Sequence, residues 1–339
     1  MSWADLPRAG IVQNETPQVL CAGIIVLDEV FRVEEFPRPD GKVQAKEFFT
    51  VNGGCAANAA LAIARLGGRV ALAGPMGGPA GADGNGDRVL AALAREGVDC
   101  SACQRIAGLA TALSAIFINK RGDRMIVTYR DERIAAVAPA DPDGLVARAA
   151  IVLADNRYPA FVAPICAAAR RRGLPVVLDA DRPTFEDDPL FAMASHLVFS
   201  SECLRETTGL ADLAEGLTRM AHKTGAFLAV SNGADDIIYL QDGKPQRLPV
   251  FPICAVDTLA AGDALHGGIA LAVAEGASVV DAMRFGAAVA GIKCSRFGGS
   301  AGMPTRAEVE ALLTLHFGRR AAANGPAVAG AAPPRGRAE

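Results

Sequence analysis

The chain has 339 residues, 51% of them hydrophobic, and a formal net charge of −3 at pH 7. This length and composition allow one large α/β domain or two ordinary ones, and the charge predicts no broad basic surface for nucleic acid. No apolar run reaches the ~18 residues of a membrane span, the N-terminus lacks a secretory signal, and the eight scattered cysteines form no disulfide framework. We therefore expect a cytoplasmic protein with no nucleic-acid or membrane partner.

The first 150 residues predict strands and helices, with two half-exposed β segments among them. The apolar run Val19–Leu27 predicts a buried strand that ends at Asp28. Residues 30–51 and 111–129 alternate apolar and polar side chains, and the second segment predicts a hairpin about 120–123. The other elements expected here are a helix over 56–66, a strand over 69–74 and a helix over 87–96.

From residue 150 onward, strands and helices alternate regularly, which predicts an α/β fold with a doubly wound, mostly parallel sheet flanked by helices. The expected strands are 151–154, 176–179, 197–200 and 227–230, with antiparallel strands over 237–240 and 247–250. The expected helices are 161–172, 213–224, 263–275, 278–296 and 305–317. Four aspartates lie at or just beyond strand ends, where such folds bind ligands: Asp28, Asp155, Asp179 and Asp257.

Several catalytic motifs are absent from the sequence. It has no GxxxxGK[ST] phosphate loop, no HExxH metal pair and no GxSxG nucleophile elbow. The single Cys100-x-x-Cys103 pair has no second pair beside it and is weak support for zinc. The sequence therefore leaves any metal-ligating residues unidentified.

The stretch 256–268 brings small residues and a carboxylate to the start of an apolar helix. Ala260, Ala261 and Gly262 allow a ligand to approach the backbone closely, and a helix start favours an anion such as phosphate. Asp263 has two interpretations from the residues alone. It either caps the helix, which is the commoner role, or acts as a general base beside a phosphoryl group.

Two motifs in this order resemble those of the ribokinase-like (PfkB) sugar kinases. Asn52-Gly53-Gly54-Cys55-Ala56-Ala57-Asn58 is similar to that family's Gly-Gly…Asn motif, and 257–263 is similar to its Asp-Thr-x-Gly-Ala-Gly-Asp motif. The resemblance implies a sugar-kinase domain over residues 18–320, with a small β-sheet lid from about 30–51 and 111–130. It also implies ATP and Mg²⁺ as cofactors and a homodimer formed through the lid. The composition of 1–17 and of the Ala/Gly/Pro-rich segment 321–339 predicts flexible tails.

The resemblance also implies a role for each matching residue. Asp263 would be the general base, and the backbone N–H groups of Ala260, Ala261 and Gly262 would form the anion hole. The sugar-binding residues would be Asp28, Gly53, Gly54 and Asn58. The nucleotide-binding residues would be Ser231, Gly233, Thr258 and Gly262.

The sequence departs from the family pattern at three places. Ala260 replaces a glycine, which its methyl tolerates if φ is negative but not easily if φ is positive. The family's Asn-x-x-Glu, which helps to order magnesium, aligns with Ser200 and Cys203, with Glu202 one position away. Asp236 replaces the last glycine of the Thr-x-Gly-x-x-Gly pattern near the nucleotide.

Stretches 153–157, 177–181 and 293–302 resemble one branch of the family, the 6-deoxy-6-sulfofructose kinases. Lys42 and Arg157 match the Lys and Arg that bind the sulfonate in that branch, and Thr128 occupies the position of a neutral Asn in the lid of that branch. The departure at Thr128 leaves open fructose, a fructose or tagatose phosphate, or a nucleoside as substrate. The altered motifs also leave open a non-catalytic sugar- or nucleotide-binding protein.

Overall fold

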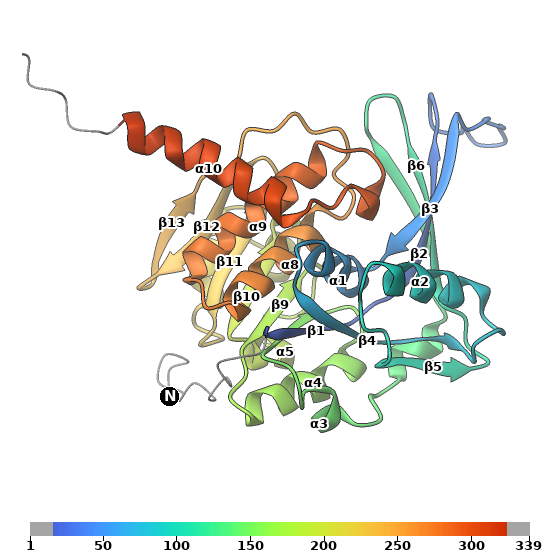
Figure 1. Cartoon of the computed structure of the whole chain (residues 1–339), viewed down its shortest axis with the longest axis horizontal. Helices are drawn as coiled ribbons and strands as arrows, with labels where there is room; N and C mark the ends of the chain where they lie inside the picture. Colours follow the sequence, from blue (N-terminus) through green and yellow to red (C-terminus); the bar gives the residue numbers. More distant parts are fainter. Residues whose placement is uncertain (1–15, 324–339) are drawn as a thin grey trace, which may run out of the picture.

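The computed structural model describes residues 16–323, with side chains described as far as residue 316. The chain forms one sheet of nine strands and one of four (Figure 1). The order in the large sheet is β13-β12-β11-β10-β9-β8-β1-β4-β5, and the order in the small sheet is β3-β2-β6-β7. The strands are β1 Gln18–Ala22, β2 Val26–Arg32, β3 Glu47–Gly53, β4 Arg69–Gly78, β5 Cys103–Ala107, β6 Ala112–Ile118, β7 Arg124–Tyr129, β8 Ile151–Asp155, β9 Val176–Ala180, β10 His196–Ser200, β11 Phe227–Asn232, β12 Asp235–Gln241 and β13 Lys244–Leu248.

Helices cover both faces of the large sheet. Along β1, Val19 and Cys21 face one apolar core and Leu20 and Ala22 face the other, as a strand buried on both faces requires. In the described large sheet β12 pairs antiparallel with both β11 and β13, and the other pairings are parallel, so the predicted α/β fold class is confirmed. The helices are α1 Cys55–Arg65, α2 Gly84–Arg95, α3 Pro142–Leu145, α4 Pro159–Arg171, α5 Pro189–Met193, α6 Ser201–Thr208, α7 Leu213–Met220, α8 Ala261–Ala274, α9 Val279–Cys294 and α10 Arg306–Ala323, with short 3₁₀ turns η2 Glu132–Ala136 and η3 Gly299–Gly302.

The predicted single strand Val19–Leu27 is wrong. The chain leaves the large sheet after β1, crosses at Gly23 and enters the small sheet as β2, so Asp28 lies within β2 rather than at a strand end. Gly23 has φ +152°, and a Cβ there would lie 1.9 Å from Asp155 Oδ2. The N–H of Ile24 donates to that same carboxylate at 2.7 Å, which fixes the crossing.

Other boundaries also differ from the sequence-based expectations. In the segment 30–51, β2 starts before residue 30, the chain from 33 to 46 is not strand, and β3 runs on to Gly53. The strand predicted at 247–250 is β13, and β5, α3, α5 and α6 were not predicted. Helix α10 continues to Ala323, past the predicted start of the tail at 321, and the tail segments 1–15 and 324–339 lie outside the described residues.

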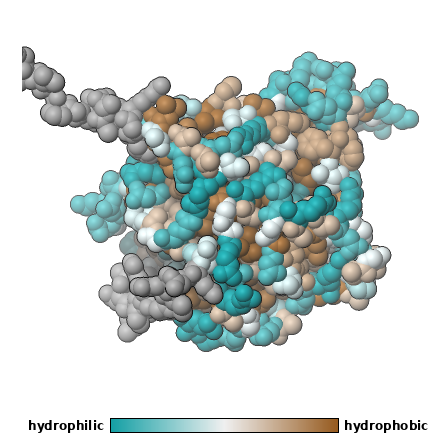
Figure 2. Space-filling view, in the orientation of Figure 1, coloured by the Kyte–Doolittle hydropathy of each residue, from teal (hydrophilic) through white to brown (hydrophobic). Residues whose placement is uncertain are grey.

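The small sheet lies beside α1 and α2, at the upper right of Figure 1. Its inner face packs Val30, Ile116 and Ile118 against Leu259 and Phe297, which come from the other end of the chain. Polar residues gather at its outer tip (Figure 2), where Lys120 pairs with Glu35. Among the described residues, no helix combines the length and apolarity needed to cross a membrane.

Candidate active site

Asp263 lies in the first turn of α8 and is half-buried. The N–H of Ala264 is the first to donate four residues back, to Ala260 O at 3.0 Å, so the N–H groups of Gly262 and Asp263 lack partners within the helix. The N–H of Ala261, predicted to belong to the anion hole, instead donates to Thr258 O at 3.2 Å. The helix start therefore offers two N–H groups and a positive dipole end beside a carboxylate.

Asn58 connects this helix start to α1. Its Nδ2 donates to Asp263 Oδ2 at 2.7 Å, although the two residues are 205 positions apart. Asn58 is buried, and its Oδ1 has no hydrogen-bond partner within the described chain. Because a buried acceptor without a partner is costly, this oxygen is suited to receive a ligand hydroxyl.

Asp28 in β2 lies beside Gly53, the last residue of the adjoining strand β3, and Gly54 follows as the N-cap of α1. A Cβ on Gly53 would lie 2.2 Å from the Asp28 carboxylate, so only glycine allows this approach. Gly54 has φ +91°, and a Cβ there would lie 2.4 Å from Ile24 O. The structure thus brings together four predicted sugar residues, since Asn58 follows Gly54 in the first turn of α1.

Three residues outside the predicted catalytic and sugar-binding sets support this cluster: Asp155, Asp179 and His266. Asp155 Oδ2 accepts from Ile24 N at 2.7 Å and Ala56 N at 3.2 Å, and so joins the strand crossing to the start of α1. His266 Nδ1 lies 2.7 Å from Gly262 O and 3.4 Å from Asp179 Oδ2. The strand-end positions of the two aspartates were the available signal, whereas His266 had none.

Burial raises the pKa of several of these carboxyl groups. The pKa of Asp263 rises to about 7, chiefly because burial disfavours its charge and then because Asp179 repels it, while the Asn58 hydrogen bond lowers it. Burial raises the pKa of Asp28 and of Asp155 to about 6, and also raises that of Asp179. A carboxylate with a pKa near 7 is well matched to accepting a proton at neutral pH.

Cys55, Asp179 and Asp263 form the one group of potential metal ligands found among the described residues, with ligand atoms within 4.8 Å of one another. Carboxylate oxygens suit Mg²⁺, but a thiol does not. Burial raises the pKa of the Cys55 thiol well above its usual range, so the thiol stays protonated. The group therefore does not fit a resident Mg²⁺ site made of protein ligands alone.

The three residues predicted for an anionic substrate differ in their surroundings. The guanidinium of Arg157 pairs with Asp181, and the backbone N–H of Arg157 donates to Asp155 Oδ1 at 2.9 Å, next to the cluster. Thr128 on β7 is exposed and lies 3.5 Å from Ser114, which hydrogen-bonds Asp28. Lys42 lies in the exposed chain between β2 and β3, and no hydrogen bond or ion pair within the described residues joins it to the cluster.

The predicted nucleotide-binding residues lie near the carboxyl ends of parallel strands in the large sheet or in the chain before α8. Ser231 lies near the end of β11, with its hydroxyl toward Phe199 O at 3.4 Å, and Gly233 forms the next turn with φ +62°. Thr258 is exposed in the chain before α8, and Asp236 lies in β12. Ser200, which replaces the family asparagine, caps α6 by accepting from Cys203 N at 3.1 Å.

Ala260 has the unfavourable backbone conformation. Its φ is +63° and its ψ is 17°, in the left-handed region where a Cβ is strained. The condition under which the methyl is easily tolerated is therefore not met, and the loop beside Asp263 holds strain that glycine would not have.

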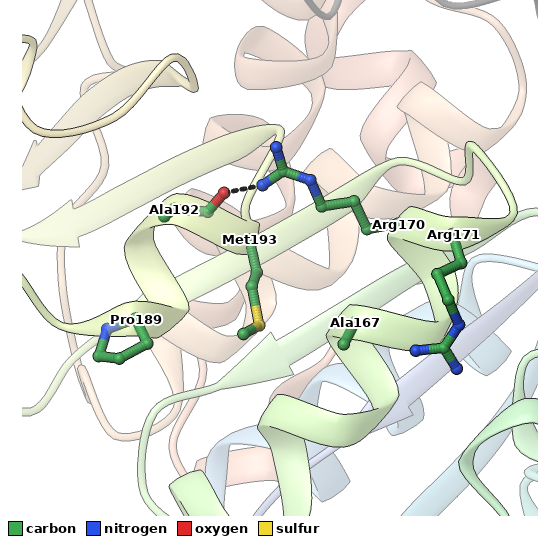
Figure 3. A pocket seen from close by; sticks show the side chains of 6 residues that line it. All are labelled: Ala167, Arg170, Arg171, Pro189, Ala192 and Met193. Carbon is green, nitrogen blue, oxygen red and sulfur yellow. Dashed lines mark hydrogen bonds between the residues drawn. The ribbon is translucent and has the colours of Figure 1, made fainter.

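A separate cavity of about 510 Å³ lies between α4 and α5 (Figure 3). Arg170 there donates to Ala192 O, and Arg171 pairs with Asp143 at 2.7 Å. The cavity contains none of the residues of the Asp263 cluster, so it is not part of this site.

Comparisons with known proteins agree with this arrangement. A family model described as pfkB family carbohydrate kinase matches residues 16–306. The ribokinase of Haemophilus influenzae is 27% identical over 303 residues, which cover 87% of this chain and 96% of that protein. The ketohexokinase of Mus musculus is 28% identical over 297 residues, which cover 83% and 97%. A protein from Agrobacterium tumefaciens, solved as a candidate ribokinase, superposes with a TM-score of 0.85 at 35% identity over 90% of this chain and 100% of that one.

Proposed function

The chain belongs to the pfkB family of carbohydrate kinases and is an ATP-dependent kinase of that kind, and we propose that it phosphorylates a hydroxyl of a ketose, with Asp263 as the general base. The observation that carries this assignment is the hydrogen bond from Asn58 to Asp263 at the start of α8. It joins the two family motifs and places an unpartnered acceptor beside a carboxylate and a helix N-terminus.

The proposed reaction is an in-line phosphoryl transfer. Asp263 accepts the proton of the sugar hydroxyl as its oxygen bonds to the γ-phosphorus of ATP, and the bond from that phosphorus to the bridging oxygen breaks to release ADP. The N–H groups of Gly262 and Asp263 stabilise the charge on the γ-phosphate oxygens. Ser231, Gly233 and Thr258 bind the nucleotide.

Mg²⁺ fits this reaction as a partner of ATP. Because burial raises the pKa of the Cys55 thiol and Asn58 already bonds Asp263, the protein offers few ligands of its own. The ion would be held mainly by the phosphates, with Asp179 nearby, since its carboxylate oxygen lies within 4.8 Å of that of Asp263. When bound there, Mg²⁺ neutralises phosphate charge.

The small sheet has the features of a lid that excludes water and forms a dimer contact. Its inner face covers Leu259, next to the Asp263 loop. Its outer strands carry large apolar side chains that are 48% to 60% exposed: Phe48, Ile126, Val127 and Tyr129. Exposed apolar side chains on one small sheet are typical of a protein interface, and we assign them to a second copy of this chain.

An anionic ketose such as 6-deoxy-6-sulfofructose is the substrate that the charges favour. Asp28 and Asn58 would bind the sugar hydroxyls, and Gly53 and Gly54 would allow the sugar to approach closely. The anionic group of the substrate would face Lys42, Thr128 and Arg157. The guanidinium of Arg157 has five N–H donors, so its ion pair with Asp181 leaves other donors that can bind an anion. Fructose, a fructose or tagatose phosphate and a nucleoside are the alternatives.

A coupled ADP-release assay over a substrate panel tests this function. The panel contains 6-deoxy-6-sulfofructose, fructose, fructose 6-phosphate, tagatose 6-phosphate, ribose and adenosine. We expect the highest kcat/KM with an anionic ketose. A preference for neutral fructose or for adenosine would contradict the substrate class, and no release with any sugar would contradict the kinase site.

A further inference from the structure

Lys293, near the end of α9, is the one lysine among the buried residues of the described chain, and its side chain is 0% exposed. Lysine is almost never fully buried, because removing an ammonium group from water is costly unless it is paired. Burial lowers the pKa of Lys293, and the charge of Asp257 opposes that shift. A side chain held at this cost requires an explanation.

Both oxygen partners of the ammonium belong to Asp257, which begins the second family motif. Nζ donates to the backbone oxygen of Asp257 at 2.7 Å and lies 3.3 Å from its carboxylate Oδ2. The side chain of Asp257 is 1% exposed, so the pair is closed to solvent. Breaking a buried pair leaves an uncompensated charge, so each partner depends strongly on the other.

The Asp257 carboxylate in turn holds three backbone N–H groups. Oδ1 accepts from Leu259 N at 2.8 Å, and Oδ2 accepts from Gly298 N at 3.1 Å and Gly299 N at 2.7 Å. The N–H groups of Val256 and Asp257 donate to Cys294 O at 2.8 and 3.1 Å. The ammonium and carboxylate thus form the centre of a polar network that joins the chain before α8 to the end of α9.

This network adjoins the start of α8, where the anion hole is proposed, and it also contacts the small sheet. Leu259 is directly followed by the strained Ala260 and then by the first turn of α8. Leu259 and Phe297 also pack on the apolar inner face of the small sheet, and Ser300 Oγ donates to Asn52 O at 2.7 Å. The same few residues therefore set the loop before Asp263 and contact the proposed lid.

We propose that Lys293 is a positioning residue, a built-in cation that holds residues 257–262 so that the Gly262 and Asp263 N–H groups face the transferred phosphoryl. The inference rests on the proposed function of that helix start. It explains how the loop keeps Ala260 in a left-handed conformation, because the surrounding hydrogen bonds over-determine the backbone there.

The test compares Lys293→Met, Lys293→Ala and the exposed control Lys244→Met, using the sugar with the highest wild-type kcat/KM. A misplaced anion hole should lower kcat roughly 100-fold with little change in the KM values for ATP and sugar. Propylammonium, which replaces the atoms missing in Lys293→Ala, should restore part of the lost turnover, whereas tetramethylammonium at equal ionic strength should not. Lys244→Met should behave as wild type.

Hydrogen–deuterium exchange supplies a readout that is independent of turnover. In Lys293→Met the amides of Leu259, Gly298 and Gly299 should lose protection while those of the large sheet keep it. A kcat within twofold of wild type, or unchanged exchange at these amides, would overturn the proposal, as would a loss of activity that matches the unfolded fraction measured by circular dichroism. Absence of wild-type activity with any sugar would refute the proposed function, and the exchange comparison would still decide the positioning role.

Discussion

Replacing Ala260 with glycine should separate backbone strain from the other consequences of losing a methyl group. The left-handed conformation of Ala260 costs about 1.5 kcal/mol, which glycine avoids. Glycine also increases the conformational entropy of the unfolded chain, which lowers the free energy of unfolding by about 0.7 kcal/mol. Removing a half-buried methyl loses about 0.4 kcal/mol more. Ala260→Gly should therefore raise the free energy of unfolding by about 0.4 kcal/mol.

The neighbouring Ala261→Gly is the matched control, because Ala261 is also half-buried but lies in α8 without a positive φ. Ala261→Gly has the same entropic cost and the same loss of methyl burial as Ala260→Gly, but it relieves no backbone strain. It should therefore lower the free energy of unfolding by about 1.1 kcal/mol. The two variants should then differ by about 1.5 kcal/mol, or about 2 °C in Tm for a domain of this size. Urea unfolding and calorimetry measure both quantities. Equal destabilisation by the two substitutions would refute the strain at Ala260.

Three further predictions concern the site itself. Because the pKa of Asp263 is raised to about 7 and the base must be ionised, kcat/KM should fall about tenfold per pH unit below 7 and level off above it; a flat profile from pH 6 to 8 would contradict this. Asn58→Ala removes a hydrogen bond that lowers that pKa, so the midpoint should move to higher pH and kcat/KM should fall roughly 10- to 100-fold, with Tm unchanged because an unpartnered buried oxygen is also removed. Arg157→Gln should raise the KM for an anionic ketose roughly tenfold and leave that for fructose nearly unchanged; equal changes would remove Arg157 from the anion site.

The alternation of strands and helices made the fold class predictable, because periodicity follows from which faces are buried. Asp263 and Asn58 were also identified, since each lies in a short motif at the start of a helix. The division of the run 19–27 into two strands was not predictable, because nothing in its apolar composition marks the point where Gly23 lets the chain cross between sheets.

Contacts between distant segments account for most of what the sequence did not show. Asp155 was visible as a strand-end aspartate, but its bonds to Ile24 and Ala56 depend on the tertiary fold. The pairing of Arg157 with Asp181 and the burial of Lys293 likewise depend on how strands and helices pack. The strain at Ala260 was predicted only as a condition on φ, and the structure supplies the value.

The measurement that tests the central claim most directly is the turnover of Asp263→Asn beside its affinity for ATP. The variant keeps the size and most of the shape of the side chain but cannot accept the proton of a sugar hydroxyl. If Asp263 is the general base, kcat should fall roughly 10²- to 10⁴-fold, while isothermal titration calorimetry gives an ATP affinity close to that of wild type. Turnover near the wild-type value would contradict the assignment.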